Sequence, residues 1–188
     1  MSSISPQTFQ YKNGDQVVIR SACLDDAPAL IKHAETVLTE PNFAVTQADE
    51  FDFVEEQERE WIKRHLDSLG SIVLVAEVDG NIVGMLGFEC GQRRRLAHRG
   101  TLAMSLLKEF RGRGIGSALM QALIEWGENN PNMEKLTLAV LATNKPAIAL
   151  YGKFGFVEEG RRPREVKLGP RQYVDDILMY RFVDQSGQ

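Results

Sequence analysis

The chain contains only two cysteines, Cys23 and Cys90, among 188 residues. Two cysteines do not make a disulfide framework, so a disulfide-rich secreted class is excluded and both are expected to be small buried hydrophobic residues. No apolar run approaches the length of about 18 residues that a membrane span requires. Residues 1–10 lack the basic and then apolar pattern of a secretion signal. We therefore expect a cytoplasmic protein that has no membrane partner.

The chain also lacks an excess of positive charge, because 22 Lys and Arg stand against 26 Asp and Glu, a net charge of −4. Binding of a nucleic acid through bulk charge is therefore not expected. One basic cluster lies at residues 93–99, where no aromatic residues are interleaved with the arginines. We interpret it as a solvated hairpin loop, and we expect no metal site in the chain.

Length and composition indicate one globular domain. With 43% hydrophobic residues, a chain of this size buries about 70% of the surface that its unfolded form exposes. No internal repeat or linker divides it. We predict a domain over residues 15–184, preceded by a flexible polar segment at residues 1–14.

Hydrophobic periodicity predicts the order of the elements. A short strand at residues 16–20 precedes two helices, the first starting at Asp25 and the second covering residues 54–69. Asp79 and Gly80 form a two-residue turn between two strands. A helix over residues 115–126 carries an apolar stripe that packs on a sheet. The remaining predicted strands are residues 71–78, 81–89, 101–107, 136–141, 156–167 and 172–182, and a short helix starts near Asn144.

The glycine-rich turn at residues 111–117 joins a predicted strand to the first turn of a helix. At such a turn, several backbone N–H groups have no helical partner and the helix dipole adds partial positive charge, which favours an anion. A P-loop is excluded because no lysine follows the glycines, and the dinucleotide pattern G-x-G-x-x-G does not fit. A phosphate site and a plain surface turn rich in glycine and arginine both remain open on this turn alone.

Two motifs together resemble one family. The turn reads R-x-x-G-x-G from Arg111, and residues 144–156 read N-x-x-A-x-x-L-Y-x-K-x-G-F. Both patterns, in this order, are similar to those of the GNAT (Gcn5-related) N-acetyltransferases. The resemblance implies an α/β fold of mixed α+β character, with a twisted sheet of about seven strands flanked by about four helices. It also implies a V-shaped opening between the fourth and fifth strands.

The resemblance further implies that acetyl-CoA is the cosubstrate and lies in this opening. Residues 111–117 would hold its pyrophosphate, and the backbone of Leu106 and Lys108 would bind the pantetheine arm. The CoA tail would be lined by Asn144, Ala147 and Lys153. Tyr151 matches the general acid of the family, because a phenol can protonate a departing thiolate; ordinary packing of a short helix is the alternative. The implied cofactor residues are Leu106, Lys108, Arg111, Gly112, Arg113, Gly114, Ile115, Gly116, Ser117, Asn144, Ala147 and Lys153.

The general base is less clear from the sequence. Histone-type members of the family carry a glutamate on the fourth strand, and the matching position here falls near Gly100. His98 is the nearest titratable group on the same strand face and is the candidate base, although a histidine without a role is an equal alternative. Glu89 and Glu77 on neighbouring strands are weaker candidates. The missing glutamate argues against a histone-type lysine substrate.

The acceptor is expected to be a primary amine on a small molecule, an amino acid or polyamine, or the N-terminus of a peptide or protein. An acidic and aromatic segment at residues 39–53 suits a cation, whereas Arg161, Arg162, Arg164 and Arg171 suit a carboxylate. Residues 173–179 are similar to bacterial family members that acetylate amino acids, polyamines and ribosomal proteins. None of these features selects one acceptor.

Two other functions compete with catalysis. A catalytically silent module that binds acyl-CoA is supported by the unclear base, and nucleotide binding at a Rossmann-like site is disfavoured by the glycine spacing. Many relatives pair as homodimers, but no sequence feature decides the oligomeric state here.

Overall fold

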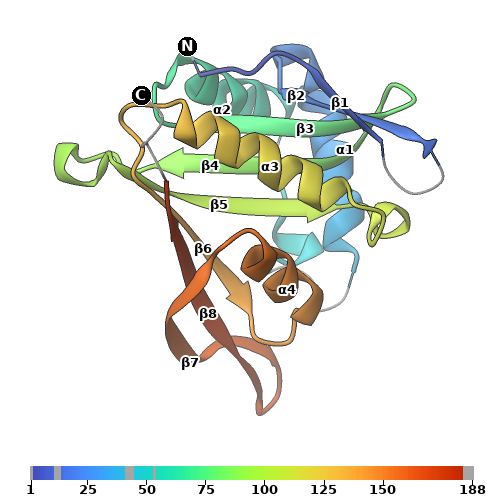
Figure 1. The fold of residues 1–188 in the computed structure, drawn as a ribbon. Coiled ribbons are helices and arrows are strands. Elements are labelled where there is room, and N and C mark those ends of the chain that lie inside the picture. The colour runs from blue at the N-terminus through green and yellow to red at the C-terminus, as the bar shows by residue number, and fades with distance from the viewer. Residues whose placement is uncertain (1, 11–13, 41–44, 53, 184–188) are drawn as a thin grey trace.

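The computed structural model describes residues 2–10, 14–40, 45–52 and 54–183. Parts of the predicted N-terminal segment (residues 1 and 11–13), residues 41–44 with Phe43, Phe53 and the domain end at residue 184 lie outside the described residues. The described strands form one sheet in the order β1-β2-β3-β4-β5-β6-β8-β7 (Figure 1). They are β1 (Gln7–Gln10), β2 (Gln16–Ser21), β3 (Ile72–Val78), β4 (Asn81–Cys90), β5 (Arg99–Leu106), β6 (Lys135–Leu141), β7 (Val157–Gly169) and β8 (Gln172–Phe182).

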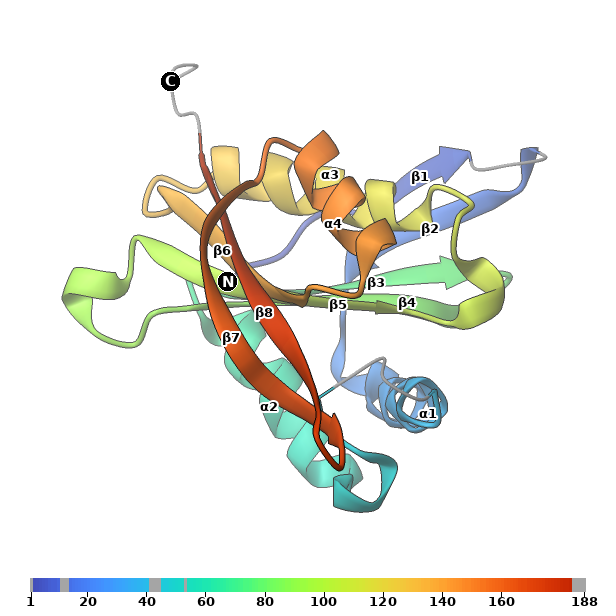
Figure 2. The same cartoon turned by 90° about the horizontal axis from the view of Figure 1, so that it is seen from below.

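The helices cover both faces of the sheet. Helices α1 (Ala27–Leu38) and α2 (Glu55–Asp67) lie on one face, and α3 (Ile115–Glu128) and α4 (Lys145–Lys153) lie on the other (Figure 2). The predicted mixed α/β fold with four helices is confirmed. The sheet has eight strands rather than about seven, because residues 7–10, inside the segment that was expected to be flexible, pair with β2. In the described residues, no helix is both long and apolar enough to cross a bilayer.

The apolar stripe predicted for the central helix forms the larger core. Its six residues are buried and pack on strands β2 to β6; they are Ile115, Ala118, Leu119, Ala122, Leu123 and Trp126. A smaller cluster on the opposite face packs α1 and α2 on β3 through Leu30, Ile62 and Val75. Burial of such side chains contributes about 1.5–3 kcal/mol each, so the sheet is held rigidly from both faces.

Strands β5 and β6 are the only parallel neighbours among the described strands, and they pair only briefly. Their ladder covers Arg99–Thr101 on β5 and Lys135–Thr137 on β6, and then stops. The Thr101 and Thr137 hydroxyls lie 3.0 Å apart at this point, and Thr137 also donates to the carbonyl of Gly100 at 2.8 Å. Beyond it the two strands diverge, and β6, β8 and β7 turn away from the rest of the sheet (Figure 1).

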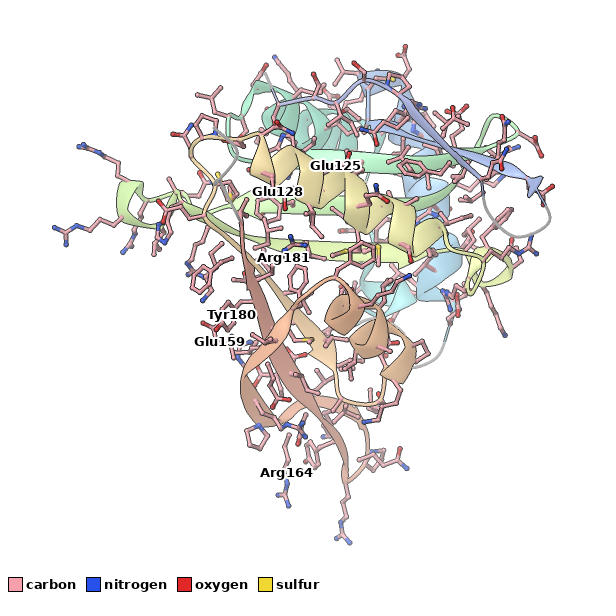
Figure 3. All side chains as sticks on the ribbon, in the orientation of Figure 1. Glu125, Glu128, Glu159, Arg164, Tyr180 and Arg181 are labelled. Carbon is pink, nitrogen blue, oxygen red and sulfur yellow. The ribbon has the colours of Figure 1, made fainter. Side chains whose placement is uncertain are left out.

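Two arginines fix the parts that flank this opening. Arg20 of β2 makes a bidentate contact with Asp26, at the start of α1, and also binds Glu77 of β3. Arg181 of β8 binds Glu128 at the end of α3 and the carbonyl of Phe154 after α4, each at 3.0 Å (Figure 3). Because the first arginine anchors α1 and the second anchors α4, both sides of the opening are positioned by the sheet.

The packing around Gly100 on β5 explains why no glutamate occupies the position where histone-type family members carry one. A Cβ atom there would lie 2.4 Å from Cζ of Phe88 and 2.6 Å from the backbone oxygen of Glu89. Both distances are shorter than real Cβ contacts, and Phe88 is fully buried. The strand pairing of β4 and β5 therefore excludes every side chain at residue 100.

We expect Gly100→Ala to lower the free energy of unfolding by about 1–3 kcal/mol, because the new methyl group overpacks the Phe88 pocket. Gly160→Ala on β7 is the matched control, since a Cβ there meets nothing within 4 Å. Urea unfolding of both variants measures the difference. Equal stability of the two variants would contradict the steric account.

Candidate active site

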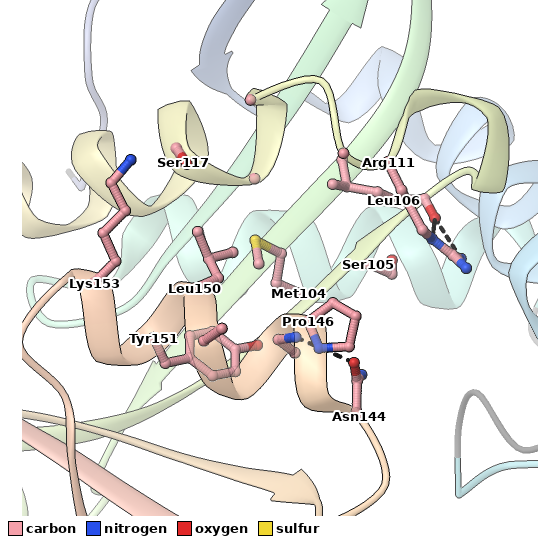
Figure 4. Close-up of a pocket in the computed structure, with 15 residues that line it drawn as sticks. Met104, Ser105, Leu106, Arg111, Ser117, Asn144, Pro146, Leu150, Tyr151 and Lys153 are labelled. Atoms are coloured by element: carbon pink, nitrogen blue, oxygen red, sulfur yellow. Dashed lines mark hydrogen bonds between the residues drawn. The ribbon is translucent and has the colours of Figure 1, made fainter.

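A cavity of about 470 Å³ lies where β5 ends, between the start of α3 and helix α4 (Figure 4). Its walls come from three segments that are far apart in the sequence. The lining residues are Met104, Ser105, Leu106, Arg111, Gly112, Gly114, Gly116, Ser117, Asn144, Pro146, Ala147, Ala149, Leu150, Tyr151 and Lys153. The cavity is therefore the place where the two sequence motifs meet.

The glycine-rich turn has the geometry of an anion cradle. Gly112 and Gly114 take φ values of 69° and 104°, which side chains rarely adopt. The first backbone bond of α3 runs from the N–H of Ala118 to the carbonyl of Gly114. The preceding N–H groups of residues 115–117 thus have no helical acceptor, and they carry the positive end of the helix dipole. This end of the cavity suits a phosphate group.

Gly116 keeps the two helices close without closing the cavity. A Cβ atom there would lie 3.2 Å from Leu150 of α4 and 3.4 Å from Leu106 of β5. Any larger side chain would fill the space between them. The second glycine of R-x-x-G-x-G therefore serves close approach rather than a positive φ.

The Arg111 side chain is directed away from an anion in the cradle. Its guanidinium donates to the Leu106 carbonyl at 2.9 and 2.7 Å and forms a bidentate pair with Glu40 at 2.7 and 2.6 Å. Its charge is thus largely balanced by a carboxylate that follows α1. Arg111 joins the end of β5 to the end of α1, so the positive character of the cradle comes from backbone N–H groups and from Lys153.

Helix α4 supplies the opposite wall. The Asn144 side chain accepts a hydrogen bond from the N–H of Ala147 at 3.2 Å and so caps the helix. Tyr151 is only 6% exposed, and burial raises the pKa of its phenol to about 12. Its hydroxyl points along the helix into the cavity (Figure 4). Tyr151 therefore presents a neutral hydroxyl group at any physiological pH.

The structure brings most of the predicted cofactor residues to this cavity. Lys108 and Arg113 do not line it, and Arg113 lies over the Phe110 ring at 5.4 Å. Ile115 is fully buried in the core under α3. The other predicted positions do line it: Leu106, Arg111, Gly112, Gly114, Gly116, Ser117, Asn144, Ala147 and Lys153.

The predicted base, His98, is not brought to the cavity. It precedes β5, and its carbonyl accepts from Glu134 and Lys135 at the start of β6. At roughly 3.4 Å per strand residue, about 24 Å separate it from Ser105 at the far end of β5. His98 therefore lies at the closed end of the opening, and no role in proton transfer follows from its position.

Sequence reasoning missed three residues near the cavity. Glu40 holds Arg111, and His33 of α1 lies 2.8 Å from the hydroxyl of Ser105 through its Nε2 atom. The helical spacing of Leu30, His33 and Val37, which are the buried residues with Ala27 on α1, is a signal that could have located His33. Nothing in the sequence pairs it with a residue on β5.

The family model of the Acetyltransferase (GNAT) family matches residues 31–156. The chain is 36% identical over 121 residues to "L-amino acid N-acetyltransferase AaaT" of Escherichia coli strain K12, covering 64% of this chain and 74% of that protein. It is 33% identical over 172 residues to an "N-alpha-acetyltransferase" of Sulfurisphaera tokodaii, covering 87% and 90%.

Solved structures of acetyltransferases have a similar fold. A GNAT-family acetyltransferase from Streptococcus pneumoniae superposes with a TM-score of 0.85 at 29% identity, covering 89% of this chain and 99% of that one. The fold of YncA from Salmonella typhimurium, solved with acetyl-CoA, matches with a TM-score of 0.79 at 17% identity, covering 92% and 96%.

The free energy of unfolding depends on pH through His33. Burial and the nearby charge of Arg111, itself paired with Glu40, lower the pKa of His33 to about 4 from 6.5. Between pH 6.5 and pH 4 the unfolded chain binds a proton at His33 that the folded chain does not bind. The free energy of unfolding is therefore unaffected by His33 above pH 6.5 and decreases as the pH falls towards 4. The loss reaches at most about 3 kcal/mol.

We expect His33→Gln to remove this component, so that the stability difference between variant and native protein shrinks from pH 7 to pH 4. Urea unfolding across this range is the measurement. Parallel curves for the two proteins would show that His33 titrates normally. His98→Gln, which alters a histidine away from the cavity, is the control.

Proposed function

Because the chain belongs to the GNAT acetyltransferase family, we propose that it transfers the acetyl group of acetyl-CoA to a primary amine in the opening between β5 and β6. The observation that carries this proposal is the cavity at the end of β5. It joins an anion cradle on α3 to a buried tyrosine on α4, at the place where the sheet separates.

The residues present fit the donor. The N–H groups at residues 115–117 and the Lys153 cation suit its phosphates, and the apolar walls from Met104, Leu106 and Leu150 suit its arm. By alternation along β5, the backbone groups of Met104 and Leu106 face the opening, since Leu107 pairs with Val83 of β4. Bound acetyl-CoA supplies the thioester that the amine attacks.

The acceptor approaches from the opposite face of the sheet. Thr101 and Ala103 of β5 are exposed on the side of α1 and α2, above a hollow of about 610 Å³ that also includes Trp61 and Glu89. Ser105 continues this face as far as the cavity. Donor and acceptor thus enter from the two faces and meet between β5 and β6.

In the reaction, the amine nitrogen bonds to the carbonyl carbon and the C–S bond breaks, with its electron pair leaving on sulfur. One proton passes from nitrogen to sulfur. A phenol of pKa about 12 cannot hand its proton outright to a thiolate of pKa about 8.5 without a cost of about 5 kcal/mol. Tyr151 therefore donates to sulfur while its proton is replaced from the ammonium formed by the attack.

We infer the acceptor class from the walls of the cavity, since Glu89 lies in the hollow on the other face and pairs with Thr101 at the closed end of the opening. Among the described residues, no aspartate, glutamate or histidine lines the cavity. Near pH 7.4 an α-amino group with a pKa of about 7.8 is roughly one-quarter neutral, whereas a lysine side chain is only about 0.1% neutral. The site therefore suits the α-amino group of an amino acid or peptide, which is what two of its relatives are named for acetylating.

The arginines of the last hairpin contribute less to recognition than their number suggests. Arg161 lies 3.5 Å from Glu158 and Arg162 lies 3.4 Å from Glu165, so both cations are partly balanced on their own strand. Arg164 lies over the Tyr173 ring at 5.9 Å. We place acceptor recognition mainly on the face of β5.

The lack of a base also supports the alternative function, a silent module that binds acyl-CoA. We expect release of CoA thiol when the protein meets acetyl-CoA with L-amino acids or with short peptides that have free N-termini. Peptides blocked at the N-terminus but carrying lysine should react at least tenfold more slowly. Binding of acetyl-CoA in calorimetry without thiol release from any acceptor would establish the silent module instead.

We expect Tyr151→Phe to lower kcat by about 100-fold or more, because a positioned acid contributes that much, while the Kd for acetyl-CoA changes less than threefold. Tyr180→Phe is the matched control, since Tyr180 of β8 makes an edge-to-face contact with Phe182, lies under Lys135 and does not line the cavity. Steady-state kinetics and calorimetry separate the two effects. An unchanged kcat would remove Tyr151 from the chemistry.

A further inference from the structure

A buried histidine that belongs to neither sequence motif contacts a residue that lines the cavity. His33 of α1 is 2% exposed, and its Nε2 atom lies 2.8 Å from the Ser105 hydroxyl. Ser105 is on β5 and lines the cavity. The other ring nitrogen of His33, Nδ1, is buried and has no hydrogen-bond partner within the part of the chain that the structure describes.

This arrangement selects one tautomer. A buried N–H without an acceptor is rarer and more costly than a bare acceptor, so the single proton of the neutral ring lies on Nε2 and Nδ1 carries the lone pair. The nearby Arg111 cation favours the same neutral state, which is seen in the lowered pKa of His33. Nε2–H then donates to the Ser105 oxygen.

This tautomer of His33 determines which hydrogen bonds Ser105 can make. Because the Ser105 oxygen already accepts from His33, its own proton is free to be donated elsewhere. Ser105 stands beside Leu106, whose backbone N–H faces the opening, while Tyr151 comes from the opposite wall (Figure 4). The neighbouring residues Ser105 and Leu106 thus offer a hydroxyl and a backbone N–H at the β5 side of the cavity.

We propose that Ser105 is a catalytic residue whose hydroxyl donates to the thioester oxygen as negative charge develops on it, and that His33 is the positioning residue that aims this hydroxyl. The inference rests on the proposed acetyl transfer. Ser105 keeps its proton throughout, so the balance of the reaction is unchanged. A donor aimed at the developing oxyanion stabilises the transition state more than the bound substrate.

Two other roles for the pair fit less well. His33 is a poor general base, since burial and Arg111 both oppose the imidazolium form. Without a base, Ser105 is not activated as a nucleophile. A purely structural bond between α1 and β5 is a third role, and it predicts that loss of the Ser105 hydroxyl lowers stability without lowering kcat.

The first test is Ser105→Ala with acetyl-CoA and the best acceptor of the amino-acid and peptide panel. We expect kcat to fall about 100-fold, with the Kd for acetyl-CoA and the KM for the acceptor within threefold. Thr36→Ala is the control, because it removes an exposed hydroxyl of α1 that lines neither this cavity nor the hollow on the acceptor face. A fall confined to the acceptor KM, or no fall, would overturn the proposal.

The role of His33 is tested by rescue. His33→Leu should approach the kcat of Ser105→Ala, whereas His33→Gln, which restores an N–H donor at similar reach, should recover most of the activity. The double variant Ser105→Ala with His33→Leu should be no slower than Ser105→Ala. Additive losses, or equal effects of Leu and Gln, would show that His33 only supports packing.

A spectroscopic measurement is independent of turnover. Acetyl-CoA labelled with ¹³C at the thioester carbonyl, bound without acceptor, should show a lower carbonyl stretching frequency in the native protein than in Ser105→Ala. Identical frequencies would count against the contact. If the native protein acetylates no acceptor, the proposed function fails; if it is active and Ser105→Ala is equally active, only this inference fails.

Discussion

The brief pairing of β5 and β6 is the constraint on which the rest of the site depends. Parallel strands normally pair along their length, but here the ladder stops where the hydroxyls of Thr101 and Thr137 meet. After this point the backbone groups that β5 directs away from β4, at Met104 and Leu106, are not satisfied by β6, and buried backbone groups need partners. The Leu106 carbonyl finds one in Arg111. The others are available to a ligand, so the opening is a binding edge inside a rigid sheet.

Helix α1 supports this edge from the opposite face. Arg20 fixes the start of the helix through Asp26, and Glu40, after its end, holds Arg111. Between these points His33 reaches the Ser105 hydroxyl. Arg111, the arginine of the R-x-x-G-x-G motif, therefore has a structural role: it joins the end of β5 to the end of α1. The anion cradle depends on the backbone N–H groups of the turn that follows Arg111.

Much of this arrangement could be predicted from the sequence because its determinants are local. The stripe of α3, the helix start near Asn144 and the glycine turn are patterns within one segment each, and they correctly predicted the two helices and the turn between β5 and α3. The mixed sheet followed from the resemblance of the two motifs to the family. His98 does not line the cavity, because alternation gives the face of a strand but not the distance along it. The contacts of Glu40 and His33 join residues more than 70 positions apart, and no local pattern encodes them.

Proton acceptors are absent from the described walls of the cavity for two separable physical reasons. At Gly100 the packing of Phe88 and the Glu89 carbonyl leaves no room for a carboxylate side chain. His33 lies beside Ser105, but burial and the charge of Arg111 lower its pKa to about 4, so that it accepts a proton poorly near neutral pH. In the reaction that we propose, such a site does little to generate a neutral amine and acts mainly on the charge that forms after attack. On that proposal it discriminates by the pKa of the acceptor itself, which places α-amino groups ahead of lysine side chains.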